Sequence, residues 1–200
     1  MALCAMTDPL YAALIGYKES PVAETRAKST AVLLHHVAGF LGQHHACVEA
    51  AIGGAPDVVV PVPSTHRPDG SPLTHLRGMS RLLCASFGPA IGFADLMIRQ
   101  SAPIGHMHPH PKGFSVPPRR RQHVCGARVL LMDDTYVSGA RSQSAAAALR
   151  ANGARSVIVL PLARLLRPDR VTDHAAFLAQ AKTGTRCARC VLTQVGAGTE

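Results

Sequence analysis

Three short, uninterrupted runs of aliphatic residues limit what this chain can fold into. They cover residues 57–63 (Asp-Val-Val-Val-Pro-Val-Pro), 127–132 (Ala-Arg-Val-Leu-Leu-Met) and 156–160 (Ser-Val-Ile-Val-Leu). A β-branched run without polar alternation is typical of a parallel strand that is buried on both faces. Because Pro61 has no N–H to donate, we expect the first strand to end there or to be irregular.

Helical patterns separate these runs. Residues 24–51 carry apolar side chains at spacings of three and four, and residues 140–151 are rich in alanine and end at Asn152-Gly153. Weaker patterns predict helices over 76–87 and 171–181 and a strand over 93–99. The alternation predicts an α/β fold with a central, mostly parallel sheet flanked by helices, and residues 127–160 form one strand–helix–strand unit.

The longest segment without a period is 101–122, which holds five prolines and three histidines. A loop of this length inside a compact domain is usually functional, and we expect it to be mobile. We therefore predict an N-terminal arm over 1–23, a domain over 24–166 and a C-terminal helix with a short tail over 167–200.

Composition excludes several classes of protein. The 200 residues are 47% hydrophobic and 16% charged, which is enough to bury a core and unlike a disordered chain. No apolar stretch approaches 18 residues, so we expect no membrane span, and the N-terminus lacks the pattern of a signal peptide. Six cysteines are too sparse for a disulfide scaffold, and we expect a reduced, cytoplasmic protein.

The chain is basic, with 21 Lys and Arg against 12 Asp and Glu, giving a formal net charge of +9. Such a charge attracts polyanions, which include both nucleic acids and phosphate-rich small molecules. The only basic run is Arg119-Arg120-Arg121, and most runs of this length are solvated surface. Charge alone therefore leaves both kinds of partner open.

The most informative segment is 129–141, Val-Leu-Leu-Met-Asp-Asp-Thr-Tyr-Val-Ser-Gly-Ala-Arg. Asp133 and Asp134 close an apolar strand, and we expect a polar turn over 133–138 before the next helix. Backbone N–H groups of such a loop converge on one anion, and a glycine permits a close approach of the backbone. The alternative is that the two acids only end the strand and start the turn.

Neither of two common phosphate-binding patterns is present, because the sequence contains no G-x-x-x-x-G-K-[ST] and no G-x-G-x-x-G. The acids suit sugar hydroxyl groups, or a divalent cation that bridges to a phosphate. Together, the acids and the loop indicate a sugar phosphate or a phosphate ester with Mg²⁺.

Segment 129–141 resembles the phosphoribosyl-pyrophosphate motif of type I phosphoribosyltransferases. The helix that ends at Asn152-Gly153 and the strand after it also fit that family. Upstream, Val58-Val-Val-Pro-Val-Pro63 and Arg77-Gly78 look like the competence-protein-F-like (ComF-like) branch, and Ala13 to Lys18 is similar to the opening segment of that domain. The resemblance covers roughly residues 10–166, and an amidophosphoribosyltransferase-like relationship is part of it.

The resemblance implies a role for each matching residue. Asp133 and Asp134 would bind the ribose 2- and 3-hydroxyls of phosphoribosyl pyrophosphate. Mg²⁺ would bridge ligand oxygens without a direct protein ligand, and segment 101–122 would close over the reaction. The 5-phosphate would lie on Val137, Ser138, Gly139, Ala140 and Arg141, and the pyrophosphate on Ser64, Thr65, His66 and Arg67.

The sequence departs from the family at several positions. Val137-Ser138 replaces the usual Thr-Thr, Arg141 stands where Thr or Ser is usual, and Met79-Ser80 follows Arg77-Gly78 instead of Phe-Asn. The N-terminal four-cysteine zinc ribbon common in the ComF-like branch is absent from this sequence. Phosphate binding is therefore better supported than turnover.

Two hypotheses follow for the function. One is a phosphoribosyltransferase that transfers ribose 5-phosphate to a nitrogen acceptor, with a homodimer among the assemblies that fit. The other is a non-catalytic regulator that senses a nucleotide, or an accessory protein linked to DNA, on the same fold.

Two weaker patterns concern metals. Cys187 and Cys190 have the spacing of half a zinc site, but a turn with two free thiols is the simpler reading. His106, His108 and His110 alternate within the segment 101–122. Three histidines so spaced could bind a transition metal, or near a pyrophosphate they could instead serve as cationic contacts together with Lys112.

Overall fold

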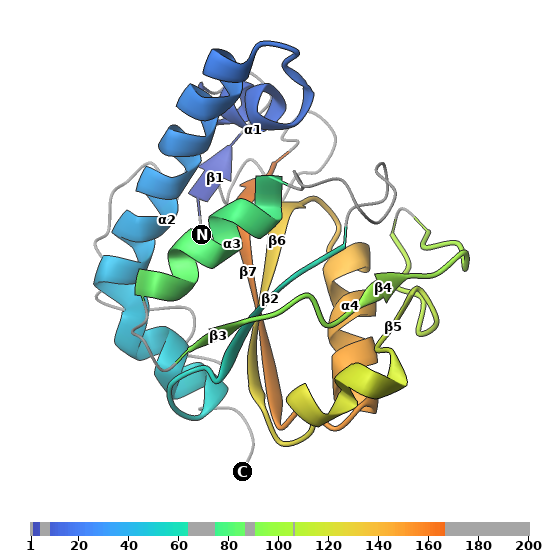
Figure 1. Cartoon of the computed structure of the whole chain (residues 1–200). Coiled ribbons are helices and arrows are strands. Elements are labelled where there is room, and N and C mark those ends of the chain that lie inside the picture. Colours follow the sequence, from blue (N-terminus) through green and yellow to red (C-terminus); the bar gives the residue numbers. More distant parts are fainter. Residues whose placement is uncertain (1, 5–8, 64–74, 87–90, 106, 167–200) are drawn as a thin grey trace. The chain divides into compact units, whose positions relative to one another are not determined.

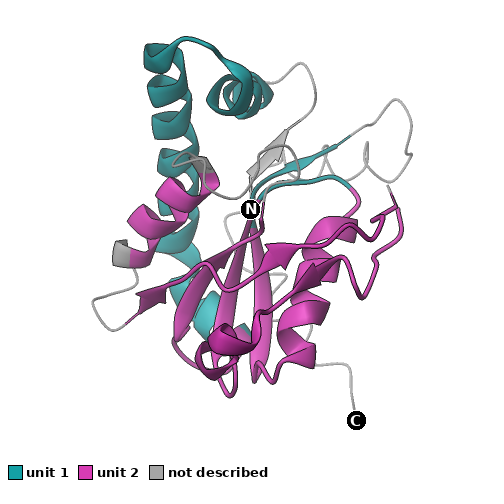
Figure 2. Cartoon of the chain, turned by 45° about the vertical axis from the view of Figure 1, so that its right-hand side comes forward, with its two compact units in different colours: residues 1–51, 134–137, 161–200 teal, residues 52–133, 138–160 magenta. Residues whose placement is uncertain are grey.

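The computed structural model describes residues 2–4, 9–63, 75–86, 91–105 and 107–166. The chain divides into two compact units, which are coloured separately in Figure 2. Unit 1 comprises residues 1–51, 134–137 and 161–200, and unit 2 comprises residues 52–133 and 138–160. The predicted helix over 171–181 lies outside the described residues.

The strands β7 (Ser156–Leu165), β6 (Arg128–Tyr136), β2 (Val58–Pro61) and β3 (Gly92–Phe93) follow one another in that order in one sheet. Strands β2 and β3 and the first parts of β6 and β7 belong to unit 2. Strand β2 is parallel to both of its neighbours. Helix α3 (His75–Ser86) packs against β2 and β3, and helix α4 (Ala140–Ala151) connects β6 to β7 (Figure 1). The structure therefore confirms the predicted α/β fold with its central parallel sheet.

The core of unit 2 is aliphatic, as the composition requires. Leu149 of α4 and Val129 and Leu131 of β6 are all fully buried in one cluster. The same cluster includes three alanines of α4, whose small side chains allow the helix to lie close to the sheet. These are Ala145, Ala146 and Ala148.

A two-stranded antiparallel hairpin also belongs to unit 2. It consists of β4 (Ile98–Arg99) and β5 (Phe114–Ser115), and β5 packs against α4, as Figure 1 shows. A short 3₁₀ helix, η1 (Pro118–His123), follows it. The buried side chains of Phe114 and Val116 anchor this part of the chain in the core.

Unit 1 contains α1 (Pro9–Glu19), most of α2 (Ala23–Ile52) and β1 (Ala2–Cys4), which pairs in parallel with the end of β7. Helix α1 buries Leu10, Ala13, Leu14 and Tyr17, which lie three and four residues apart and so form one face. No helix among the described residues is long and apolar enough to cross a membrane.

Several predicted elements are confirmed with small shifts of their bounds. Helix α4 has the predicted bounds, α2 and α3 agree within a residue, and the strand over 57–63 appears as β2. The strand over 156–160 is longer than predicted, because β7 continues to Leu165, where β1 pairs with it.

Three predictions need correction. The polar turn over 133–138 is wrong at its start, because β6 continues through Asp133 and Asp134 to Tyr136. The single strand over 93–99 is two, since β3 and β4 belong to different sheets. Segment 101–122 is not wholly irregular, because β5 and part of η1 lie within it. Its mobility stays a prediction.

Pro61 lies at the end of β2 without a cost to the sheet. The carbonyl of Val59 faces β3 and accepts a hydrogen bond from the N–H of Ala94 at 3.1 Å. By the two-residue period of a strand, Pro61 faces the same side. Pairing with β3 stops at Val59, so the missing N–H of Pro61 removes no bond of that pairing.

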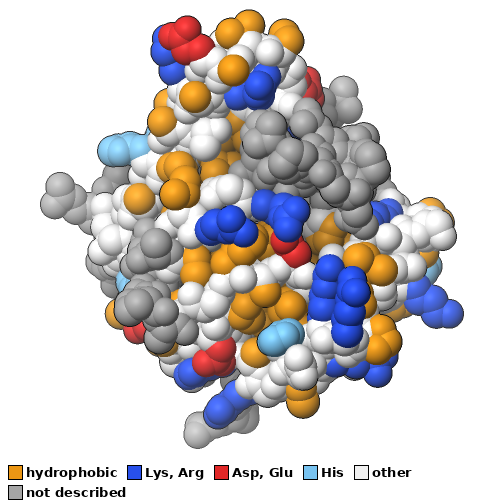
Figure 3. All heavy atoms as spheres, in the orientation of Figure 1, with side chains coloured by type: hydrophobic (Ala, Val, Ile, Leu, Met, Phe, Trp, Pro, Cys, Tyr) orange, Lys and Arg blue, Asp and Glu red, His pale blue; other side chains and the backbone are white. Residues whose placement is uncertain are grey.

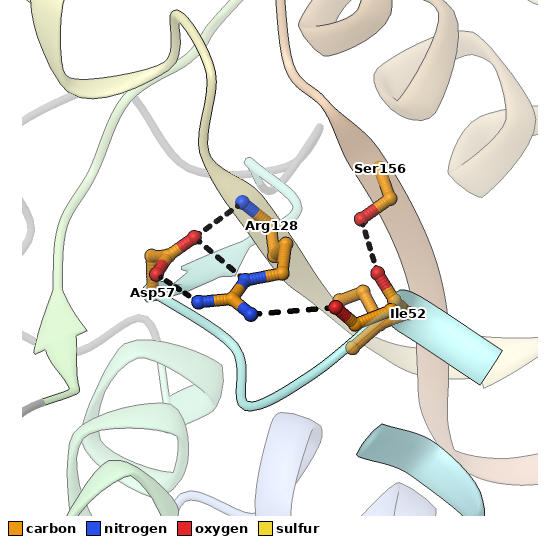
Figure 4. Close-up of polar contacts among 5 residues, drawn as sticks. Ile52, Asp57, Arg128 and Ser156 are labelled. Atoms are coloured by element: carbon orange, nitrogen blue, oxygen red, sulfur yellow. Dashed lines mark hydrogen bonds and ion pairs between the residues drawn. The ribbon is translucent and has the colours of Figure 1, made fainter. Parts of the chain in front are cut away.

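An ion pair joins the beginnings of β2 and β6 (Figure 4). The guanidinium of Arg128 contacts both carboxylate oxygens of Asp57, Nη2 to Oδ1 at 2.8 Å and Nε to Oδ2 at 3.1 Å. The backbone N–H of Arg128 donates to Oδ2 at 2.7 Å. The hydroxyl of Ser156 donates to the carbonyl of Ile52 at 2.6 Å, so the start of β7 is also tied to the end of α2.

This ion pair makes the stability of the protein depend on pH. Hydrogen bonds from Arg128 hold the pKa of Asp57 below its usual value. The ionised carboxylate therefore stabilises the fold above the pKa of the unfolded chain, and this contribution disappears as the pH falls through the folded pKa. Because the Asp57 side chain is 45% exposed, we expect Asp57→Asn to cost no more than about 1 kcal/mol at pH 7.

Urea unfolding at pH 7 and at pH 3 measures this effect. The difference between the wild type and Asp57→Asn should shrink at pH 3. Glu24→Gln removes a carboxylate from the exposed pair with Lys28 and serves as the control, with little effect at either pH. A difference for Asp57→Asn that is the same at both pH values would contradict the assignment.

Candidate anion-binding site at the β6–α4 turn

The turn between β6 and α4 begins the helix on a glycine. Gly139 is the N-terminal capping residue of α4 and has a φ of 80°, a left-handed conformation that favours glycine. Gly139 has no side chain with which to cap the first turn of the helix. The first N–H groups of a helix have no partner within the helix, and the helix dipole is positive at this end. The turn can therefore accept an anion.

Asp133 is tied to the first turn of α4. Its side chain is buried, with 3% exposure, and its Oδ2 accepts a hydrogen bond from the hydroxyl of Ser142, which is 1% exposed. A carboxylate is favoured near a helix N-terminus. Asp133 therefore links the strand to the helix, whatever else it binds.

Asp134 belongs to unit 1 and has a different partner. Its Oδ2 lies 2.8 Å from Nζ of Lys18, which also donates to the hydroxyl of Thr135 at 3.4 Å. Lys18 follows the buried Tyr17 in the last turn of α1, so the packing of α1 determines where this ammonium lies. The structure thus gives the two consecutive acids separate partners, and their joint role toward ribose hydroxyls stays a prediction.

The predicted 5-phosphate residues divide between the units. Val137 ends the segment of unit 1, whereas Ser138, Gly139, Ala140 and Arg141 belong to unit 2. The backbone N–H of Ala140 donates to the hydroxyl of Ser138 at 3.4 Å. Ala140 is buried and the side chain of Ser138 is small, so these two side chains offer a ligand few contacts. A ligand at this turn would therefore contact mainly backbone N–H groups.

Arg141 connects this turn to the end of β2. Its Nη2 donates to the carbonyl of Pro63 at 3.1 Å, and its Nε is buried without an acceptor among the described residues. Pro63 directly precedes the predicted pyrophosphate segment. The residues of that segment, Ser64, Thr65, His66 and Arg67, lie outside the described residues.

One basic residue of unit 2 was not predicted from the sequence. Arg99 at the end of β4 donates from Nη1 to the carbonyls of Gln100, Ala102 and Gly113, at 2.8, 3.1 and 2.5 Å. Burial lowers the pKa of Arg99, and the charge of Arg141 lowers it further. In the sequence, Arg99 directly follows the apolar run Leu96-Met97-Ile98, and this is the only feature that could have indicated it, because it belongs to no motif.

The other sequence candidates do not form a metal site in the described part of the chain. No group of three or more His, Cys, Asp or Glu side chains could hold a metal there. The backbone N–H of His110 donates to the hydroxyl of Ser144 at 2.9 Å, which ties this segment to α4. Cys187, Cys190 and His106 lie outside the described residues. Arg77, from the Arg-Gly pair, forms an ion pair with Asp95.

Comparisons with known proteins assign no family to this chain. No protein-family model matches the sequence, and no curated protein matches it. Among solved structures, one described as an allosteric regulatory enzyme of purine biosynthesis is similar, with 20% sequence identity and a TM-score of 0.37. The match covers 60% of this chain and 25% of that one, and no residue role is transferred from it.

The hydrogen bond between Ser142 and Asp133 yields a prediction about stability. Ser142→Ala removes a donor from a buried carboxylate, and we expect a loss of about 1–3 kcal/mol in the free energy of unfolding. Gln143→Ala changes the exposed neighbour in the same turn and should cost less than about 0.5 kcal/mol.

Urea denaturation of both variants measures this difference. A double-mutant cycle with Asp133→Asn reports the coupling between the two side chains. If Ser142→Ala were as stable as Gln143→Ala, this hydrogen bond would not be what holds Asp133 to the helix.

Proposed function

We propose that this chain is a type I phosphoribosyltransferase-like protein that binds phosphoribosyl pyrophosphate at the β6–α4 turn. The observation that carries the proposal is the turn itself, where α4 begins on the left-handed Gly139 and holds the carboxylate of Asp133 through Ser142. The resemblance of residues 129–141 to the family motif supplies the class of ligand. The Val-Pro-Val-Pro strand and Arg77-Gly78 support a place in the ComF-like branch.

The proposed ligand would use the turn in three parts. Its 5-phosphate would lie on the backbone of residues 137–141 at the start of α4, where the helix dipole favours an anion. Its ribose hydroxyls would donate to the carboxylates of Asp133 and Asp134. Its pyrophosphate would meet residues 64–67, which follow the Pro63 carbonyl that Arg141 contacts.

Mg²⁺ fits this proposal as a partner of the ligand. Asp133 accepts a hydrogen bond from Ser142, and Asp134 is paired with Lys18. Two carboxylates with these partners suit the hydroxyl groups of a sugar better than a cation held only by protein ligands. We propose that Mg²⁺ binds together with the ligand and without a direct protein ligand. When bound, it would neutralise charge on the leaving group.

The reaction proposed for the site is pentosyl transfer. The bond from ribose C1 to the pyrophosphate oxygen breaks, a bond from C1 to the acceptor nitrogen forms, and the acceptor loses a proton. Positioning of the ligand and stabilisation of pyrophosphate would supply the rate, without a protein nucleophile. Binding without release of pyrophosphate would instead favour a regulator that senses a nucleotide.

A nucleic-acid partner has weaker support. Of the basic run on η1, Arg119 and Arg121 are exposed. Figure 3 shows Lys and Arg side chains on the same face as hydrophobic and uncharged side chains. Binding to a DNA phosphate backbone favours a continuous basic surface and weakens steeply with salt.

Calorimetric titration of phosphoribosyl pyrophosphate tests the proposed function. We expect micromolar binding with Mg²⁺, about −8 kcal/mol, and weaker binding with EDTA. The double variant Asp133→Asn/Asp134→Asn should lose the binding, because neutral amides accept hydroxyl donors less strongly than carboxylates.

Asp57→Asn is the matched control, since it removes a carboxylate at the opposite end of the same sheet. Its affinity should equal that of the wild type. Wild-type affinity in the Asp133/Asp134 variant would refute the site, and no binding in either buffer would refute the proposed function and direct the search to DNA.

A further inference from the structure

One ion pair of unit 1 joins helix α1 to the polar end of β6. Nζ of Lys18 lies 2.8 Å from Oδ2 of Asp134 and 3.4 Å from the hydroxyl oxygen of Thr135. The side chains of the pair are 34% and 18% exposed, whereas those of the pair between Lys28 and Glu24 are 76% and 75% exposed. Solvent and salt screen a partly buried pair less than an exposed one. Asp134 therefore has a weakly screened cation as its neighbour.

The packing of α1 determines where this ammonium lies. Lys18 directly follows Tyr17, whose side chain is 1% exposed, and its Nζ lies 5.8 Å from the centre of the Tyr17 ring. Lys18 also lies in the last turn of α1, where the helix dipole is negative and favours a cation. The ammonium is thus held by its own helix as well as by the carboxylate of Asp134.

An ammonium beside a carboxylate changes what the carboxylate can bind. Divalent cations such as Mg²⁺ and Mn²⁺ prefer oxygen ligands, but the positive charge 2.8 Å from Oδ2 of Asp134 repels them. A sugar hydroxyl is neutral, so the same charge does not repel it. Because each carboxylate oxygen can accept more than one hydrogen bond, the bond from Lys18 does not prevent a second donor from binding.

We propose that Lys18 excludes divalent cations from Asp134 and so keeps this acid for neutral hydroxyl donors. Because it acts through Asp134, Lys18 is a positioning residue and needs no contact with the ligand. The inference rests on the proposed function only for the identity of the hydroxyl donor, which is a sugar. It gives a physical reason for Mg²⁺ to bind with the ligand and not to this carboxylate.

Titration of Mn²⁺ into the ¹⁵N-labelled protein tests the exclusion, because the paramagnetic ion broadens the NMR signals of amides near its binding site. Lys18→Met removes the ammonium and keeps an unbranched side chain. We expect its amide signals from residues 133–136 to disappear at Mn²⁺ concentrations about tenfold or more below those that the wild type needs. Lys18→Gln keeps a hydrogen-bond donor without a charge, so it should also admit Mn²⁺ and serves if Lys18→Met does not fold.

Two further variants are controls for the charge. Lys18→Arg keeps a cation beside Asp134 and should match the wild type. Lys28→Met removes an ammonium from the exposed pair with Glu24 in the same unit and should also match the wild type. Wild-type Mn²⁺ concentrations for a folded Lys18→Met or Lys18→Gln would overturn the proposal. It would also be overturned if Lys18→Arg admitted Mn²⁺ as readily as the uncharged variants.

Calorimetry with ribose 5-phosphate and inorganic phosphate, both without metal, tests the proposed function separately. That function requires ribose 5-phosphate to bind more tightly than phosphate and Asp134→Asn to reduce the difference. If Lys18→Met admits Mn²⁺ but ribose 5-phosphate binds no better than phosphate, the exclusion of cations stands and the sugar assignment fails. If the preference for ribose 5-phosphate depends on Asp134 but Lys18→Met admits Mn²⁺ no better than the wild type, the proposed function stands and the exclusion fails.

Discussion

Close packing of α4 against the central strands is the contact on which the candidate site depends. Ala145, Ala148 and Leu149 share one buried cluster with residues of β2 and β6. The connection after β6 is short, and α4 begins on Gly139, whose left-handed conformation favours glycine. The hydrogen bond from Ser142 to Asp133 also joins the first turn of α4 to β6. The position of the candidate site therefore depends on the same helix and strand that form the core.

The acidic and basic side chains near the β6–α4 turn have different kinds of partner. Asp133 has a hydroxyl donor and Asp134 has an ammonium, whereas Arg99 and Arg141 have only carbonyls and a ring within the described residues. The carbonyl groups accept hydrogen bonds from Arg99 and Arg141 without cancelling their charge, and the hydroxyl of Ser142 likewise leaves the charge of Asp133 uncancelled.

Local sequence predicted the elements that have strong patterns, and tertiary pairing decided the rest. Helix α4 has its predicted bounds because alanines and the Asn152-Gly153 stop act locally. Asp133 and Asp134 appeared to begin a turn, yet strand pairing carries β6 to Tyr136. The acid–acid–loop motif marked Asp133 and Arg141 in advance. The contacts of Arg99 with three carbonyls were not predicted, because they depend on the pairing of β4 with β5, which no local pattern in the sequence indicates.

The central claim is that the start of α4 binds a phosphate group. The most direct measurement is a titration of phosphoribosyl pyrophosphate with Mg²⁺, followed by amide chemical shifts in two-dimensional ¹H–¹⁵N NMR spectra. The account predicts that the largest and saturable shifts belong to the backbone amides of residues 138–142, with Arg150 at the far end of α4 unchanged. Saturable shifts of other amides, with the chemical shifts of residues 138–142 unchanged, would contradict it.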